Sequence, residues 1–156
     1  MAAGEGGIVA DSAVEIVASG SAPGNATVSS GAMTTTASSS LAISTYQTRN
    51  FRTLVFDGSM SGSPTDGDTI DIYERALNIS DTTDDANVPD ATYKHRYVGS
   101  FILDAGGTAQ VLESSNSIPV KPYDVEYYFF CNTASVGIAV TWTVDAIHWS
   151  YNASQS

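Results

Sequence analysis

Hydrophobic and polar residues alternate along most of the chain after Tyr46, and this period of two is typical of β-strands. The alternation is clearest in residues 51–56 and 69–77, where the hydrophobic residues fall on one face. Further strands are expected at residues 93–103, 108–112, 124–132, 138–144 and 147–151. No segment of ten or more residues has the period of an amphipathic helix. The spacing of these segments predicts an all-β sandwich or barrel.

Three local features refine the expected order of strands. The Ala-Gly-Gly sequence at residues 105–107 predicts a hairpin between the strands on either side. Two prolines in residues 118–122 remove backbone donors and place this segment at a sheet edge. The hydrophobic phase changes near Asp145 and Ala146, which predicts a β-bulge or a bend there.

The segment 124–132 carries bulky residues on both of its faces. Tyr127 and Phe129 face one way, whereas Tyr128 and Phe130 face the other. A strand of this kind is either central in its sheet or covered by a neighbouring subunit.

The first third of the chain differs from the rest. Between Ile16 and Gln47 it contains no Asp, Glu, Lys or Arg and is rich in Ser, Thr, Ala and Gly. Such a composition buries too little apolar surface to offset the ordering of the backbone. The segment is therefore a flexible linker or an arm that becomes ordered on another molecule. We expect an extended arm at residues 1–45 and a jelly-roll-like antiparallel β-sandwich at residues 46–156 that folds without it.

Composition and charge exclude several classes of function. Six Lys and Arg stand against seventeen Asp and Glu, a formal net charge of −11, whereas nucleic-acid binding needs clustered cations. No segment is long enough to span a membrane, and the N-terminus lacks the pattern of a signal peptide. The single cysteine, Cys131, excludes an intrachain disulfide. We expect a protein made in the cytoplasm that binds neither nucleic acid nor membranes.

Few side chains could carry out catalysis. His95 lies in a charged stretch typical of a solvated strand start, and His148 lies on the face opposite Ile147 and Trp149, as a structural or surface histidine would. Cys131 shares an apolar face of its strand, where cysteines are usually inert. No nucleophile elbow, P-loop or zinc-protease motif occurs. We expect no enzymatic activity and no cofactor.

Acidic residues crowd the loop that follows residue 80. They are Asp81, Asp84, Asp85 and Asp90. Calcium binds six to eight oxygen ligands, often from closely spaced carboxylates, so this loop is a weak candidate calcium site. The alternative is a solvated loop that keeps the protein soluble.

Exposed aromatic rings could stack against sugars. The candidates are Trp149, Tyr151, Tyr123 and Tyr128. In a sandwich with eight tyrosines and two tryptophans, however, most rings are expected in the core or at an interface.

Residues 66–73, 97–101 and 118–128, followed by Asn132 and a tryptophan-containing last strand, resemble small β-sandwich structural proteins of tailed-phage virions. Head decoration (cement) proteins are the most similar group. The resemblance covers residues from about 66 to 151. It depends on the order and the residue composition of these segments, not on one motif. The Ser/Thr-rich N-terminal third departs from a plain decoration domain and could instead belong to a tail or fibre protein.

The resemblance implies a non-enzymatic virion protein, made in the host cytoplasm, that binds the outside of a capsid and stabilises it through intersubunit contacts. Its implied partners are the major capsid protein and further copies of itself in a homotrimer. The candidate interface residues are Ile8, Val9, Val14, Ile16 and Val17 in the arm, and Tyr128, Phe130, Trp149 and Tyr151 in the sandwich. The alternative function is a carbohydrate-binding or receptor-binding module of a virion tail or fibre.

Overall fold

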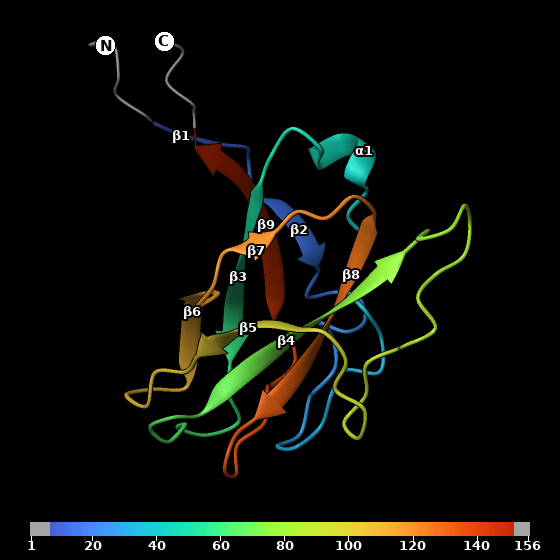
Figure 1. The fold of residues 1–156 in the computed structure, drawn as a ribbon. Coiled ribbons are helices and arrows are strands. Elements are labelled where there is room, and N and C mark those ends of the chain that lie inside the picture. The colour runs from blue at the N-terminus through green and yellow to red at the C-terminus, as the bar shows by residue number, and fades with distance from the viewer. Residues whose placement is uncertain (1–6, 152–156) are drawn as a thin grey trace.

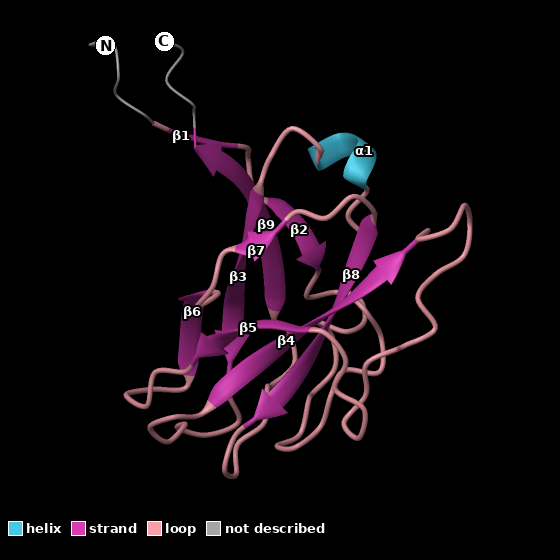
Figure 2. Ribbon diagram, in the orientation of Figure 1, coloured by secondary structure: helices cyan, strands magenta, loops and turns pink. Residues whose placement is uncertain are grey.

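The structure, a computed structural model, describes residues 7–151, which form two antiparallel β-sheets packed face to face (Figures 1 and 2). The larger sheet comprises β1 (Ile8–Ala10), β2 (Val14–Val17), β3 (Phe51–Ser59), β6 (Ala109–Glu113), β7 (Ile118–Pro119) and β9 (Thr143–Tyr151). The smaller sheet comprises β4 (Thr69–Leu77), β5 (Tyr97–Ile102) and β8 (Asp124–Asn132), and the short helix α1 spans Ile43–Tyr46. The all-β prediction is confirmed, but these sheet orders do not confirm a jelly roll.

Long-range pairing organises each sheet around one or two central strands. In the larger sheet β9 pairs with β3, while β1 and β2 extend the sheet beyond β9, and β6 and β7 extend it beyond β3. In the smaller sheet β4 lies between β5 and β8. The alternating hydrophobic residues of these strands meet between the sheets.

The core contains large side chains that are almost fully buried. They include Leu54, Phe56, Ile70, Ile72, Phe101, Phe129 and Trp142. Burying a side chain of this size contributes roughly 1.5–3 kcal/mol, so this layer is the main source of stability.

The turn at residues 103–108 does not form the expected hairpin. It connects β5 in the smaller sheet to β6 in the larger sheet, so it carries the chain from one sheet to the other. The glycines indicate a turn, but they do not specify which strands pair.

An irregularity does lie beside Asp145, but the extra residue is in β2 and not in β9. Glu15 pairs with Asp145 and Val17 with Val144, whereas β9 pairs with β3 in regular register throughout this region. The phase change instead marks the point beyond which the outer face of β9 becomes apolar. The segment before β9 is a loop in which only Ile138 forms isolated bridges, not the strand expected at 138–144.

Residues 7–45 form part of the sandwich. Ile16 and Val17 are at most 2% exposed, and Val28 and Leu41 join the same core. Residues 31–41 run antiparallel along the edge of β8 that β4 leaves free, with four backbone donors 2.8–2.9 Å from its carbonyl oxygens. These donor–acceptor pairs are Gly31–Cys131, Thr34–Phe129, Ser38–Tyr127 and Leu41–Val125.

This placement corrects the expectation that residues 1–45 fold only on another molecule, although residues 1–6 lie outside the described part. The hydroxyls of this segment accept hydrogen bonds from β8: Tyr127 N donates to Ser38 Oγ (3.0 Å) and Phe129 N to Thr34 Oγ1 (3.1 Å). Small polar residues suit this position because a charged side chain would be costly to bury there. A composition poor in apolar residues predicts disorder only when the backbone has no other partners. Here β8 supplies hydrogen-bond partners that cannot be read from composition.

We predict that Leu41→Ala lowers the free energy of unfolding by about 2–5 kcal/mol, because it leaves a cavity in the core. Thr35→Ala, at an exposed position of the same segment, should change it by less than about 0.5 kcal/mol. Urea denaturation of both variants measures the difference. Equal, small effects would show that the segment contributes little to the fold.

Candidate functional site

The four acidic residues of the calcium hypothesis do not converge. Asp84, Asp85 and Asp90 each accept hydrogen bonds from nearby backbone N–H groups, those of Asn78, Asn87 and Thr92 respectively. Asp85 also pairs with Arg96 at 3.0 Å, and its hydrogen bond from Asn87 N lowers its pKa. Among residues 7–151 no group of three or more His, Cys, Asp or Glu side chains could hold a metal ion.

The sulfur of Cys131 contacts Thr133 and Val136, not His148. The thiol is buried, and burial raises its pKa, which disfavours the reactive thiolate. His95 lies instead beside the exposed ring of Tyr93. These three groups therefore do not assemble into a nucleophile–base pair.

Four polar side chains meet in the core between the two sheets. Arg52 and His148 come from the larger sheet, and Glu74 and Tyr127 from the smaller one; all four are at most 2% exposed. Arg52 donates to His148 Nε2 (2.7 Å) and to the Tyr127 hydroxyl (2.6 Å). Tyr127 in turn donates to Glu74 (3.1 Å). We call these four residues the core network.

Lys121, which is partly exposed, links the core network to the surface by donating to Glu74 Oε1 at 2.9 Å. Lys121 lines a shallow surface hollow of about 540 Å³ together with Arg49 and Asn50. Arg49 is already paired with Asp11, and Lys121 with Glu74, so neither cation is free to hold an anionic ligand. The network joins the two sheets and offers no open reaction site.

His148 is neutral in this environment. The Arg52 guanidinium has no acceptor atom, so His148 Nε2 must accept and Nδ1 must carry the proton. Nδ1 is buried without a partner among the described residues, and the Tyr46 ring stacks on the imidazole at 3.7 Å. Burial, reinforced by the charge of Arg52, lowers the pKa of His148 to about 4.

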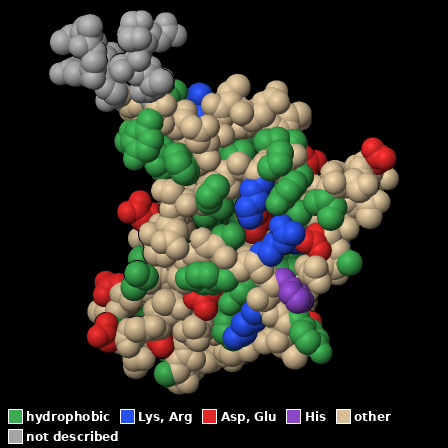
Figure 3. Space-filling view, viewed as in Figure 1, with side chains coloured by type: hydrophobic (Ala, Val, Ile, Leu, Met, Phe, Trp, Pro, Cys, Tyr) green, Lys and Arg blue, Asp and Glu red, His purple; other side chains and the backbone are tan. Residues whose placement is uncertain are grey.

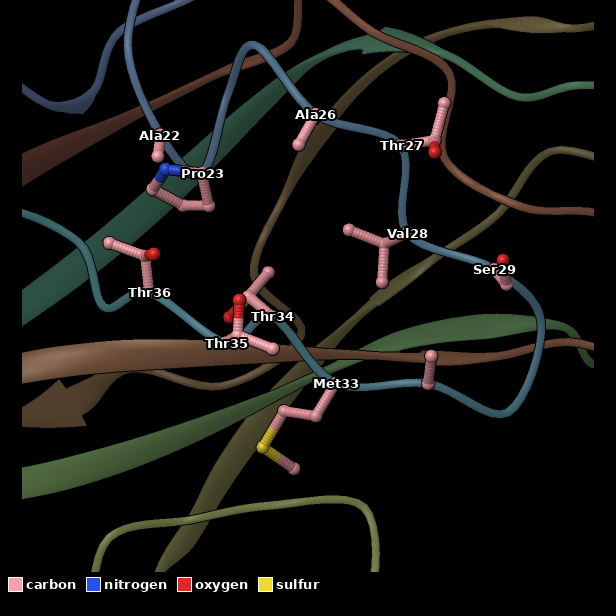
Figure 4. A pocket seen from close by; sticks show the side chains of 11 residues that line it. Ala22, Pro23, Ala26, Thr27, Val28, Ser29, Met33, Thr34, Thr35 and Thr36 are labelled. Atoms are coloured by element: carbon pink, nitrogen blue, oxygen red, sulfur yellow. The ribbon is translucent and has the colours of Figure 1, made fainter.

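A second hollow, of about 280 Å³, lies inside the charge-free N-terminal segment (Figure 4). Pro23, Val28 and Thr36 lie around it in the figure, and all of its lining residues come from positions 22–36. The lining contains no charged side chain, so it provides no group for proton transfer or for an ionic ligand.

The outer face of the smaller sheet carries basic and hydrophobic side chains (Figure 3). Arg75 pairs with Glu126 at 3.1 Å, and Lys94 lies over the Phe130 ring at 3.7 Å. Tyr128 and Phe130 are only 6% exposed, in a small cluster with Met33. The chain's own side chains thus cover the outer face of β8. This strand does not need a neighbouring subunit to bury its second bulky face.

The candidate interface residues therefore divide into two groups. Ile16, Val17, Tyr128 and Phe130 are buried within the chain, and Val14 packs against the core. The others lie at one end of the larger sheet and are partly or well exposed: they are Ile8, Val9, Trp149 and Tyr151.

We call Ile8, Phe51, Trp149 and Tyr151 the aromatic patch. Ile8 lies opposite Tyr151, and Phe51 lies opposite Trp149, so all four share the outer face of the sheet. The Trp149 ring lies 4.9 Å from that of Phe51 and 5.3 Å from that of Tyr151. Ile8 and Tyr151 remain 66% and 64% exposed, so no described residue covers the patch.

The sugar-binding candidates do not form a flat platform. Tyr128 is buried, and the Tyr123 hydroxyl accepts a hydrogen bond from Arg96 on another part of the surface. The Trp149 and Tyr151 rings are nearly perpendicular, at 88°. Stacking against a sugar ring uses the face of an aromatic ring, so these two rings do not offer a sugar one flat surface.

Comparisons of the chain with protein-family models, with curated proteins and with solved structures find no match. The resemblance to virion decoration proteins therefore depends on the sequence pattern alone. No helix in the described residues is long and apolar enough to cross a membrane.

We predict that acid destabilises the fold through His148. Above pH 6.5 the imidazole is neutral in the folded and in the unfolded chain. Below pH 6.5 the unfolded chain binds a proton on His148, whereas the folded chain does not bind it until the pH falls to about 4. The free energy of unfolding should therefore fall by up to about 3 kcal/mol between pH 6.5 and 4, as measured by urea denaturation.

His148→Gln keeps an acceptor for Arg52 and should remove most of this loss. His95→Gln is the matched control and should retain it. An unchanged pH dependence in His148→Gln would rule out His148 as the source.

We also predict that Tyr127→Phe lowers the free energy of unfolding by about 1–3 kcal/mol, because Arg52 and Glu74 each lose a buried partner. Tyr123→Phe removes a hydroxyl with a more exposed hydrogen bond and should cost less than about 0.5 kcal/mol. Thermal unfolding of the two variants compares them. Similar costs would mean that the core network adds no more than a surface hydrogen bond.

Proposed function

We propose that the protein is a non-enzymatic structural protein that binds another protein through the aromatic patch. Following the resemblance, we propose the major capsid protein on the outside of a virion as that partner, and stabilisation of the shell as the result. The observation that carries the proposal is the exposure of Ile8 and Tyr151 beside two further aromatic rings, on a sheet face that no residue of 7–151 covers. Clustered aromatic residues of this kind are typical centres of protein interfaces.

The absence of catalysis in this proposal is supported by the state of the convergent polar groups. Arg52, Glu74, Tyr127 and His148 are buried and bonded to one another, so a substrate could reach them only if the sandwich opened. Such a network holds the two sheets together and keeps these four groups away from solvent.

The proposed mechanism differs from docking by a detached arm. Ile16 and Val17 are already buried in the sandwich, so of the candidate interface residues in this segment Ile8 and Val9 in β1 remain for an external contact. Burying the aromatic patch on each copy gives a modest contact, and repetition over a symmetric shell multiplies it. The net charge of −11 disfavours binding to nucleic acid.

A carbohydrate-binding or receptor-binding module is the alternative from a different class. It uses the same exposed rings, but the 88° angle between Trp149 and Tyr151 gives a glycan no flat surface. Binding of the protein to a glycan array, with loss of binding in Trp149→Ala, would favour this alternative.

We predict that Tyr151→Ser weakens binding to capsid shells at least about thirty-fold, because it removes an exposed ring from the centre of the contact. The measurement is co-sedimentation of the purified protein with shells that lack it. Val140→Ser, at a 49% exposed residue outside the aromatic patch, is the matched control and should bind normally. Normal shell binding by Tyr151→Ser, or no binding by the unaltered protein, would contradict the proposal.

A further inference from the structure

The described residues cover several sheet edges but leave the outer edge of β6 without a backbone partner. The edge of β8 is covered by residues 31–41, that of β5 by the bond from Ser115 N to Ser100 O (2.8 Å), and that of β2 by the bond from Ser39 N to Ile16 O (2.8 Å). β6 pairs with β3 on one side, and no described residue donates to or accepts from its backbone on the other.

The hydrogen bonds that flank β6 show which of its residues face outward. Met60 N donates to Thr108 O, and Ser114 N donates to Leu54 O, both at 2.8 Å. In an antiparallel pair every second residue bonds to the partner strand, so the even-numbered residues of β6 face β3. The odd-numbered residues, Ala109, Val111 and Glu113, therefore direct their N–H and C=O groups away from the sheet.

This edge lacks most of the features that normally prevent pairing. Natural proteins protect an exposed edge with charged side chains, especially lysine, with proline, with a bulge, or by keeping the strand very short. β6 contains no lysine, proline or bulge, and it keeps an uninterrupted register with β3 over all five of its residues. Its central residue, Val111, is 71% exposed, and its one charged residue is Glu113.

We propose that two copies of the chain pair antiparallel through β6, with a two-fold axis at Val111. Val111 then lies opposite its own copy, and Ala109 lies opposite Glu113. All three outward residues of each copy meet outward residues of the other, which gives six backbone hydrogen bonds. The two larger sheets become one continuous sheet, the arrangement that strand addition at an edge produces.

The sequence of β6 favours this register over its neighbours. A shift by two residues toward Glu113 leaves four hydrogen bonds, and a shift by four sets the two Glu113 side chains against each other. A two-fold contact of a strand with its own copy closes at two subunits, so it predicts a dimer where the resemblance implies a trimer. The inference does not depend on the proposed capsid partner, which contacts the aromatic patch.

Disulfide formation tests the register directly. Residues in a hydrogen-bonded antiparallel pair have Cα atoms about 5.5 Å apart, within the span of a disulfide. Val111→Cys should give a covalent dimer on mild oxidation, whereas Ile102→Cys, 60% exposed at the end of β5, should not. The native Cys131 is buried and does not interfere. Equal cross-linking of the two variants, or none in Val111→Cys, would overturn the proposal.

The mass in solution tests the assembly in the unaltered protein. Light scattering over a range of concentrations should show a dimer, and Val111→Pro should be a monomer because proline removes an outward N–H without touching the β3 ladder. If that variant does not fold, Val111→Lys, which sets two lysines opposite each other, serves in its place.

Ala109→Lys should tighten the dimer about two- to thirty-fold, because each new lysine lies opposite the other copy's Glu113. A monomer at every concentration, a trimer, or no effect of the three β6 variants would overturn the proposal. A dimer that fails to bind capsid shells would leave it standing and refute the proposed function alone.

Discussion

The backbone hydrogen bonds demanded by sheet edges determine much of this structure. A three-stranded sheet of β5, β4 and β8 leaves the outer edge of β8 without partners, and unpaired buried backbone groups cost free energy comparable to a lost hydrogen bond. Residues 31–41 supply these partners, partly through their own backbone and partly through the hydroxyls of Thr34 and Ser38. Uncharged side chains thus fit the buried positions Thr34 and Ser38, where a charge would be desolvated.

The second constraint is the placement of charge inside the sandwich. Arg52 and Glu74 are fully desolvated, and each is tolerable only because hydrogen bonds satisfy it. The Tyr127 hydroxyl accepts from Arg52 and donates to Glu74, so one neutral group joins both charges. Since these bonds have one satisfactory arrangement, the network fixes how the two sheets are positioned at this end, which apolar packing alone would specify less strictly.

Much of the fold follows from the sequence, and the failures have physical causes. The period of two predicts β4 with its bounds, and the run of bulky residues on both faces of 124–132 predicts β8 with its bounds. The partners of each strand are set by distant contacts, so the supposed hairpin after β5 is a crossing between sheets. Of the candidate interface, Trp149 and Tyr151 are accessible, whereas Tyr128 is buried under its own chain. The sequence does contain one indication of the core network. Arg52 lies on the same face of its strand as the core residues Leu54 and Phe56, which predicts that it is buried.

The position of the apolar residues on β9 links fold and function. Ile147, Trp149 and Tyr151 lie on the outer face of β9, although apolar side chains normally face the core. The inner face of the same part of β9 carries His148, which contacts the buried Arg52. Because the polar network occupies the interior at this end, the rings of β9 remain outside and become accessible to a partner. One strand register therefore has two results: it buries charge between the sheets, and it exposes aromatic rings on the surface. If the interior at this end were apolar, the aromatic patch would remain, but the core network would no longer fix the position of β9.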